Sequence, residues 1–216
     1  TLRSLVTSSL GHRYGAFAHA DPKNFHRASK FDHADWYNQG LLPEINRARE
    51  TFLDHFKKRY DGFPRVPIWM ASEVMSLGSL SKLYKGMQNP DQQQVVRHWG
   101  INPTVAESWL HVTTVIRNIC AHHGRLWNRE LGVRPMVPKH DQNWKVLPTN
   151  HRIYAVICML RHLTKDHHAG DDWATDVMAW LAEMNGNARW QTAMGVPADW
   201  LSHSFWRDVE AKGAKH

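Results

Sequence analysis

The chain has 216 residues, of which 42% are hydrophobic, and it contains eleven tryptophans. This composition excludes a disordered chain and suits one folded domain with a single core. The formal net charge is +7 with sixteen histidines counted as neutral, which favours a polyanionic partner, either nucleic acid or an anionic membrane face. A charge of this size also occurs in proteins that bind no polyanion, so it favours a polyanionic partner without establishing one.

Apolar periodicity and helix start and stop signals predict an all-α chain, and no alternating strand pattern stands out. The predicted helices span residues 1–15, 43–60, 67–76, 79–87, 103–122, 151–165, 171–185 and 199–212, and one more begins at Asn89–Pro90. Residues 16–40 are polar and irregular, so we expect a surface loop there, with contact to RNA as the alternative. Residues 128–148 contain three prolines and predict a second loop.

Proline, glycine and asparagine set several of these boundaries. Pro43 and Pro67 stand where a first helical turn accepts proline. Gly78 is expected to separate two helices, and Asn102 is expected to cap the long helix that follows. The first helix has no cap before it, from which we expect a chain truncated at its N-terminus.

The two cysteines, Cys120 and Cys158, each lie inside an apolar helical pattern and neither belongs to a CxxC pair. This spacing excludes a disulfide framework and a four-cysteine zinc site, and it predicts reduced thiols in a cytoplasmic protein. No signal peptide is visible, and no apolar run is long enough to cross a bilayer. We therefore expect no membrane partner.

A helical projection of residues 103–122 separates an apolar stripe from a polar face. The stripe consists of Val105, Trp109, Val112, Ile116 and Ile119. Arg117, Asn118 and His122 lie off this stripe, and Asn118 and His122 are one turn apart on the face that His111 extends. If the helix continued, His123 would project onto the stripe, so we expect a supporting role for His123.

The residue types on this polar face suit RNA cleavage without a metal. Attack of a ribose 2′-OH on its own phosphate needs a base, an acid for the leaving 5′-oxygen, and positive charge for the crowded phosphorus. Histidine can serve as base or acid, as expected for His122, and the fork of Arg117 matches phosphate oxygens. Asn118 can orient the ring or the phosphate. Because one chain supplies one such pair, we expect a two-fold homodimer to complete the site, with no cofactor.

The segment after this helix is basic and contains a tryptophan. Arg125, Trp127, Asn128 and Arg129 form a group that suits a nucleic-acid surface, and we name it the basic annex. The alternative is a helix C-terminus at which cations are stabilised by the helix dipole. An arginine and a histidine five residues apart also occur by chance in many proteins.

The string RNICAHHGRLWNR, residues 117–129, resembles the motif of the Abi family of abortive-infection phage-resistance proteins, the AbiD/AbiF-like group of the HEPN superfamily. Residues 12–25, 52–87 and 194–206 also look like segments of that family. The resemblance implies one HEPN-like helical bundle with additional helices over residues 1–216. It also implies a toxin-like, metal-independent endoribonuclease in antiviral defence, a homodimer with Arg117 and His122 as the catalytic pair, and room for an RNA or protein antitoxin.

Glu73 is a secondary candidate, because it lies among apolar residues in the segment WMASEVMSLG. An acidic residue in such surroundings usually needs a partner, and we expect Glu73 to orient Arg117 or a histidine. Some members of the superfamily place a polar residue from an early helix against the motif. The alternative is that Glu73 caps a helix or pairs elsewhere on the surface.

Other chemistries find less support. Cys120, His122 and His123 do not match common zinc spacings and HExxH is absent, so no metal site is expected. Phosphate-loop, dinucleotide and serine-hydrolase motifs are also absent. Two hypotheses remain: an endoribonuclease that acts on RNA, and a non-catalytic HEPN module that binds structured RNA or a partner protein.

Overall fold

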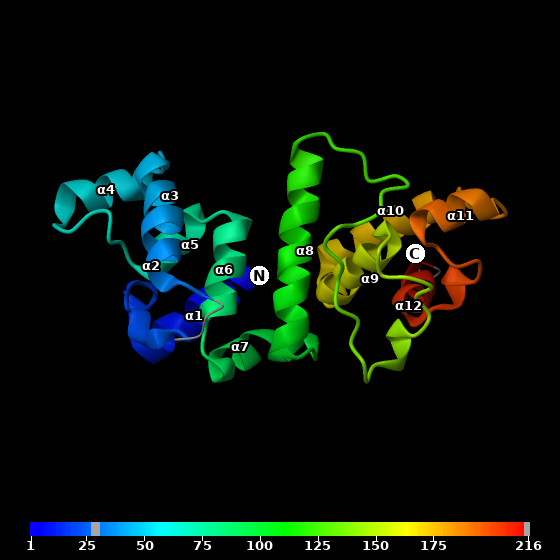
Figure 1. The fold of residues 1–216 in the computed structure, drawn as a ribbon, viewed down its shortest axis with the longest axis horizontal. Helices are drawn as coiled ribbons and strands as arrows, with labels where there is room; N and C mark the ends of the chain where they lie inside the picture. The colour runs from blue at the N-terminus through cyan, green and yellow to red at the C-terminus, as the bar shows by residue number, and fades with distance from the viewer. Residues whose placement is uncertain (27–30, 214–216) are drawn as a thin grey trace. The chain divides into compact units, whose positions relative to one another are not determined.

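The computed structural model describes residues 1–26 and 31–213, and within these residues the chain forms helices, turns and no strand (Figure 1). The predicted all-α fold class is therefore confirmed. The chain divides into two compact units, residues 1–107 and 108–216. The single domain expected over residues 1–216 stays a prediction. No helix in the described part of the chain combines the length and apolarity needed to cross a bilayer.

The first unit is built from short helices. They are α1 (Leu2–Tyr14), α2 (His33–Asp35), α3 (Leu42–Arg47), α4 (Thr51–Arg59), α5 (Ile68–Val74), α6 (Leu77–Gly86) and α7 (Asn89–Val96). α1 packs against α5 and α7, and its Val6 and Leu10 are fully buried. Contrary to the expectation of an uncapped start, the Thr1 hydroxyl accepts a hydrogen bond from the Ser4 N–H at 3.3 Å.

A buried carboxylate fixes the end of α1 on α7. Asp91 is fully buried and forms an ion pair with Arg13, and the Tyr14 hydroxyl donates to its other oxygen at 2.8 Å. Because both oxygens are satisfied, burial of this charge is tolerated. Burial and the neighbouring Asp91 both raise the pKa of Tyr14.

The predicted surface loop over residues 16–40 is wrong for the described residues 16–26 and 31–40. They form two short 3₁₀ turns, η1 (Ala18–Ala20) and η2 (Pro22–Asn24), then α2 and the π-helix η3 (Trp36–Leu41). Phe25 and Trp36 are buried with ring centroids 6.2 Å apart, and the Trp36 indole N–H donates to the Ser79 carbonyl at 3.0 Å. Tertiary packing of interleaved aromatics overrides the polar local pattern. Residues 27–30 of this prediction lie outside the described residues.

Two predicted boundaries in the first unit are also wrong. The helix expected over residues 43–60 is interrupted at Ala48, whose ψ of 140° is extended, although no proline or glycine stands there. Gly78 lies inside α6, and the break before α6 falls at Met75 and Ser76 instead. Ser76 caps α6 by accepting from the Ser79 N–H at 3.1 Å, while its own N–H donates to buried Glu44 at 3.0 Å. These side-chain partners decide the boundary.

The second unit holds most of α8 (Pro103–Ala121), followed by α9 (Ile153–Thr164), α10 (His168–Ala182), α11 (Ala188–Met194) and α12 (Ser204–Gly213). Residues Ile153–Met159 of α9 are all buried, and α10 and α12 both pack on this helix. Four fully buried tryptophans fill the interior: Trp109, Trp144, Trp200 and Trp206.

In the second unit the predicted helices are present, but two of them begin at other residues than predicted, and one further helix was not predicted. α10 begins three residues earlier than expected, and α12 begins five residues later, after a 3₁₀ turn at Trp200–Ser202. α11 was not predicted, although Asn187 caps it by accepting from the Trp190 N–H at 3.1 Å. Gly195 ends α11 with φ 73°, where an added Cβ would lie 2.6 Å from the Arg152 side chain. Only glycine fits this close approach.

Candidate active site

The start of α8 follows the sequence prediction. The Asn102 side chain accepts a hydrogen bond from the Val105 N–H at 2.9 Å, and Pro103 occupies the first turn. An asparagine cap followed by proline satisfies one N–H and removes another that would lack a partner. The helix therefore starts at a fixed residue, which fixes the faces on which later side chains lie.

The apolar stripe of α8 is buried as predicted, apart from a partly exposed Ile119. Within the second unit, Trp109 anchors the helix: its indole N–H donates to the Met136 carbonyl at 2.8 Å, and its ring lies 5.0 Å from that of Trp144. His162 packs edge-on against Trp109 at 5.3 Å. These contacts hold one face of α8 against the core and leave the opposite face to solvent.

The polar face of α8 is exposed where the sequence predicted it. Arg117, Asn118 and His122 are all exposed, and His111 is exposed further along the helix. The Arg117 guanidinium donates to the Asn118 side-chain oxygen at 3.1 Å. Asn118 thus orients the guanidinium, while the His122 ring lies at the end of the same face.

The C-terminus of α8 forms a Schellman motif, in which His122 is the capping residue directly after the last helical residue, Ala121. The Gly124 N–H donates to the Ile119 carbonyl at 2.7 Å, and the His123 N–H donates to the Cys120 carbonyl at 3.0 Å. An added Cβ on Gly124 would lie 2.8 Å from the Ile119 side chain, so glycine is required at this crossing. The last carbonyls are satisfied by backbone, and the side chains stay available.

The projection that put His123 on the apolar stripe is wrong. His123 has φ 54°, in the left-handed region, and its side chain is exposed. The helix ends at Ala121, so the periodicity no longer applies two residues later. His122 and His123 are therefore both exposed, and the supporting role of His123 stays a prediction.

The basic annex consists of two exposed arginines and two residues that contact other parts of the second unit. Arg125 and Arg129 are exposed. Asn128 has φ 50°, and both its backbone carbonyl and its side-chain oxygen accept from Arg152, at 3.1 and 3.2 Å. Trp127 is half-buried and packs edge-on against Trp190, with ring centroids 5.8 Å apart.

The structural tasks of Asn128 and Trp127 were not visible in the sequence. Arg152 and Trp190, which hold these two residues, were missed as members of the site. The one local clue was the unrecognised helix α11, which carries Trp190 between its Asn187 cap and Gly195. The annex residues that can meet a phosphate through a charged group are exposed Arg125 and Arg129, and the Arg129 guanidinium also donates to the Arg125 carbonyl at 3.3 Å.

Glu73 lies exposed on α5 in the first unit. Water therefore hydrates its carboxylate, and the burial that suggested an obligatory partner is not present. Its proposed action on Arg117 stays a prediction.

Three exposed arginines, Arg117, Arg125 and Arg129, lie in the last turns of α8 and in the segment after it, where the helix dipole is negative, and the following Glu130 pairs with Arg134. Such a group attracts phosphate. In the described part of the chain, no three histidine, cysteine, aspartate or glutamate side chains are grouped so that they could hold a metal ion.

Comparison with known proteins gives one family. The model of the family described as Abi-like protein matches residues 1–128, which include the first unit, all of α8 and most of the basic annex. The match ends six residues after His122, so the motif lies inside it. No curated protein and no solved structure matches the chain.

Proposed function

Because the chain belongs to the Abi-like protein family, we propose that it acts in abortive infection, a defence against phage, as a toxin-like endoribonuclease that needs no metal. One observation carries the proposal. Arg117, Asn118 and His122 are exposed at the end of α8, on the face opposite the buried stripe, and the hydrogen bond of Arg117 goes to Asn118. An HEPN-like arrangement of the bundle and an AbiD/AbiF-like subtype belong to the same proposal.

The proposed reaction uses the group types of this face. His122 removes the proton of a ribose 2′-OH, and the oxygen bonds to the adjacent phosphorus while the bond from phosphorus to the 5′-oxygen breaks. His122 of the partner subunit protonates the leaving oxygen. Arg117 binds the non-bridging oxygens, which carry the developing charge, and Asn118 positions Arg117. The products are a 2′,3′-cyclic phosphate and a 5′-hydroxyl end.

The test is incubation of RNA with the purified chain in the presence of EDTA, with mapping of the new ends. We expect cleavage that leaves 2′,3′-cyclic phosphates and that falls by about 10²- to 10⁴-fold in His122→Ala and Arg117→Ala. His111→Ala is the matched control, since His111 is exposed on the same face of α8 but lies about 16 Å from His122 along the helix axis. Undiminished cleavage by both motif variants contradicts the assignment.

The second candidate is a non-catalytic module that binds structured RNA or a partner protein. The contacts of Trp127 with Trp190 and of Asn128 with Arg152 favour it, because they fix a surface beside exposed Arg125 and Arg129. Binding of RNA without cleavage under the same conditions decides for this candidate. An antitoxin, whether RNA or protein, would act by covering the same end of α8.

A further inference from the structure

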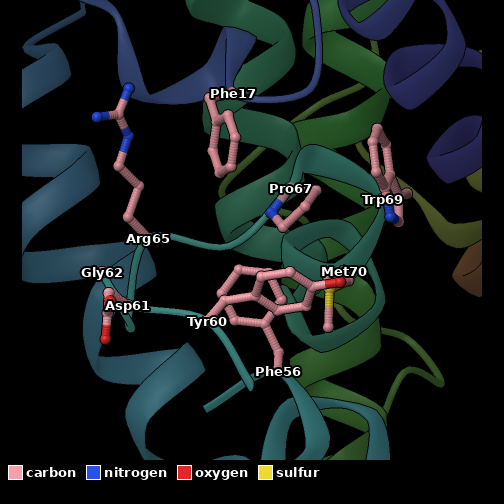
Figure 2. Close-up of a pocket in the computed structure, with 9 residues that line it drawn as sticks. All are labelled: Phe17, Phe56, Tyr60, Asp61, Gly62, Arg65, Pro67, Trp69 and Met70. Atoms are coloured by element: carbon pink, nitrogen blue, oxygen red, sulfur yellow. The ribbon is translucent and has the colours of Figure 1, made fainter. Parts of the chain in front are cut away.

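The first unit contains an open pocket of about 700 Å³ that the candidate active site does not use. Figure 2 shows aromatic side chains from three segments gathered around Pro67. Its lining includes Phe17, Phe56, Tyr60 and Trp69, with Arg65 at its edge. The size suits a ligand group of the dimensions of one or two nucleobases.

Local backbone geometry builds this pocket. Gly15, with φ 87°, ends α1, and the Ala16 carbonyl then accepts from the Ile68 N–H at 2.7 Å. That hydrogen bond places the segment of Phe17 beside the start of α5, which carries Trp69. On the other side Gly62, with φ 98°, turns the chain after α4. The pocket is therefore held by backbone contacts.

The aromatic rings are presented to solvent. Phe17, Tyr60 and Trp69 are 39%, 54% and 52% exposed, and they are the large hydrophobic residues that the described part of the first unit leaves exposed. Scattered exposed hydrophobic residues are ordinary, but a group in one concave place indicates a binding surface. The Phe56 ring packs against the Tyr60 ring, with ring centroids 4.9 Å apart.

The charged residues that line the pocket are Asp61 and Arg65. The adjoining end of α4 adds the exposed cations Lys57, Lys58 and Arg59, so the surface around the pocket carries an excess of positive charge. The Arg65 guanidinium lies 5.2 Å from the Phe17 ring centroid, and the Lys57 ammonium lies 5.3 Å from that of Phe63. Flat rings with adjacent cations are the combination that holds bases by stacking and their phosphates by charge.

We propose that this pocket binds unpaired bases of single-stranded RNA, which stack on Tyr60 and Trp69 while Arg65 in the lining and Lys57 and Lys58 on the adjoining end of α4 hold the neighbouring phosphates. A partner protein with an apolar surface would leave these cations without counter-charge, whereas the RNA backbone supplies it. The choice of RNA over another strand rests on the proposed function, but the stacking site does not depend on the chemistry at His122. It selects strands that present unpaired bases.

The test measures binding of a fluorescein-labelled oligouridylate by anisotropy, with every variant in the His122→Ala background so that no strand is cut. We expect Tyr60→Ala and Trp69→Ala each to weaken binding about 10-fold, and Trp69→Phe to retain it because the ring remains. Trp180→Ala, at an exposed tryptophan of α10, is the matched control and binds as the parent does. Lys58→Gln is expected to lower the slope of log affinity against log salt by about 0.7.

Several outcomes overturn the proposal. Unchanged RNA affinity in the Tyr60→Ala and Trp69→Ala variants, with folding verified by circular dichroism, excludes the stacking site. A free nucleotide that binds as tightly as the oligouridylate excludes a strand as the occupant. A lower solution mass in these variants with RNA affinity retained assigns the pocket to a protein interface. Failure of cleavage by the wild-type chain contradicts the proposed nuclease and leaves the binding result to stand separately.

Discussion

At the scale of single residues, the least usual environment is that of His19. Its side chain is fully buried in the first unit, and neither ring nitrogen has a hydrogen-bond partner within the described residues. Burial lowers the pKa of His19 from 6.5 to about 4, and the nearby charges of His33 and Arg65 act in the same direction. The neutral ring is therefore the form that the fold accepts.

This depressed pKa predicts a pH-dependent stability. Above pH 6.5 the ring is neutral in both the folded and the unfolded chain, and the stabilisation of the neutral form is fully present. As the pH falls from 6.5 to about 4, His19 becomes protonated in the unfolded chain but stays largely neutral in the folded chain. The free energy of unfolding therefore falls by about 3 kcal/mol. Urea unfolding of wild-type and His19→Leu chains at both pH values measures this. A pH dependence that is equal in the two chains contradicts the prediction.

At the scale of elements, the end of α8 determines how the motif is presented. A Schellman motif normally places glycine at the left-handed position, but this chain has His123 there, followed by Gly124. A left-handed non-glycine residue costs about 1 kcal/mol. The helix end is thus slightly strained next to His122.

Replacing His123 with glycine should therefore separate structure from chemistry. We expect His123→Gly to raise the free energy of unfolding by about 1 kcal/mol, because the left-handed backbone costs glycine little. If His122 is the catalytic histidine, cleavage of RNA by this variant stays within a few-fold of wild type. Thermal unfolding and the end-mapping assay measure the two effects. Loss of cleavage with stability gained would instead assign the proton transfer to His123.

At the scale of the whole molecule, one chain carries one Arg117 and one His122. General acid and general base act on opposite sides of the scissile phosphate, and one histidine cannot occupy both positions in a single step. The proposed reaction uses His122 in both roles, so it draws the second His122 from a partner subunit.

A dimer of this kind can be measured directly. We expect a solution mass twice the chain mass of 25.1 kDa. Specific activity should fall on dilution below the dissociation constant of the dimer, since the monomer lacks a complete site. Light scattering and a dilution series of the cleavage assay test this together. Full activity in a chain shown to be monomeric would contradict the composite site.

Local sequence patterns were enough to predict the helical class, the capped start of α8, its buried stripe and the exposure of Arg117, Asn118 and His122. These features depend on local rules: a cap acts within four residues, and helical periodicity assigns faces along one helix. The all-α expectation and the polar face of α8 follow from such rules, and no tertiary contact reverses them.

Features made by residues far apart in the chain could not be predicted from local patterns and depend on the folded structure. The fold of residues 16–26 and 31–40 depends on buried aromatic contacts, the anchoring of Asn128 depends on Arg152, and the aromatic pocket depends on the contact between Ala16 and Ile68. Local pattern carries no information about which distant partner satisfies a buried group, so packing had to settle these features.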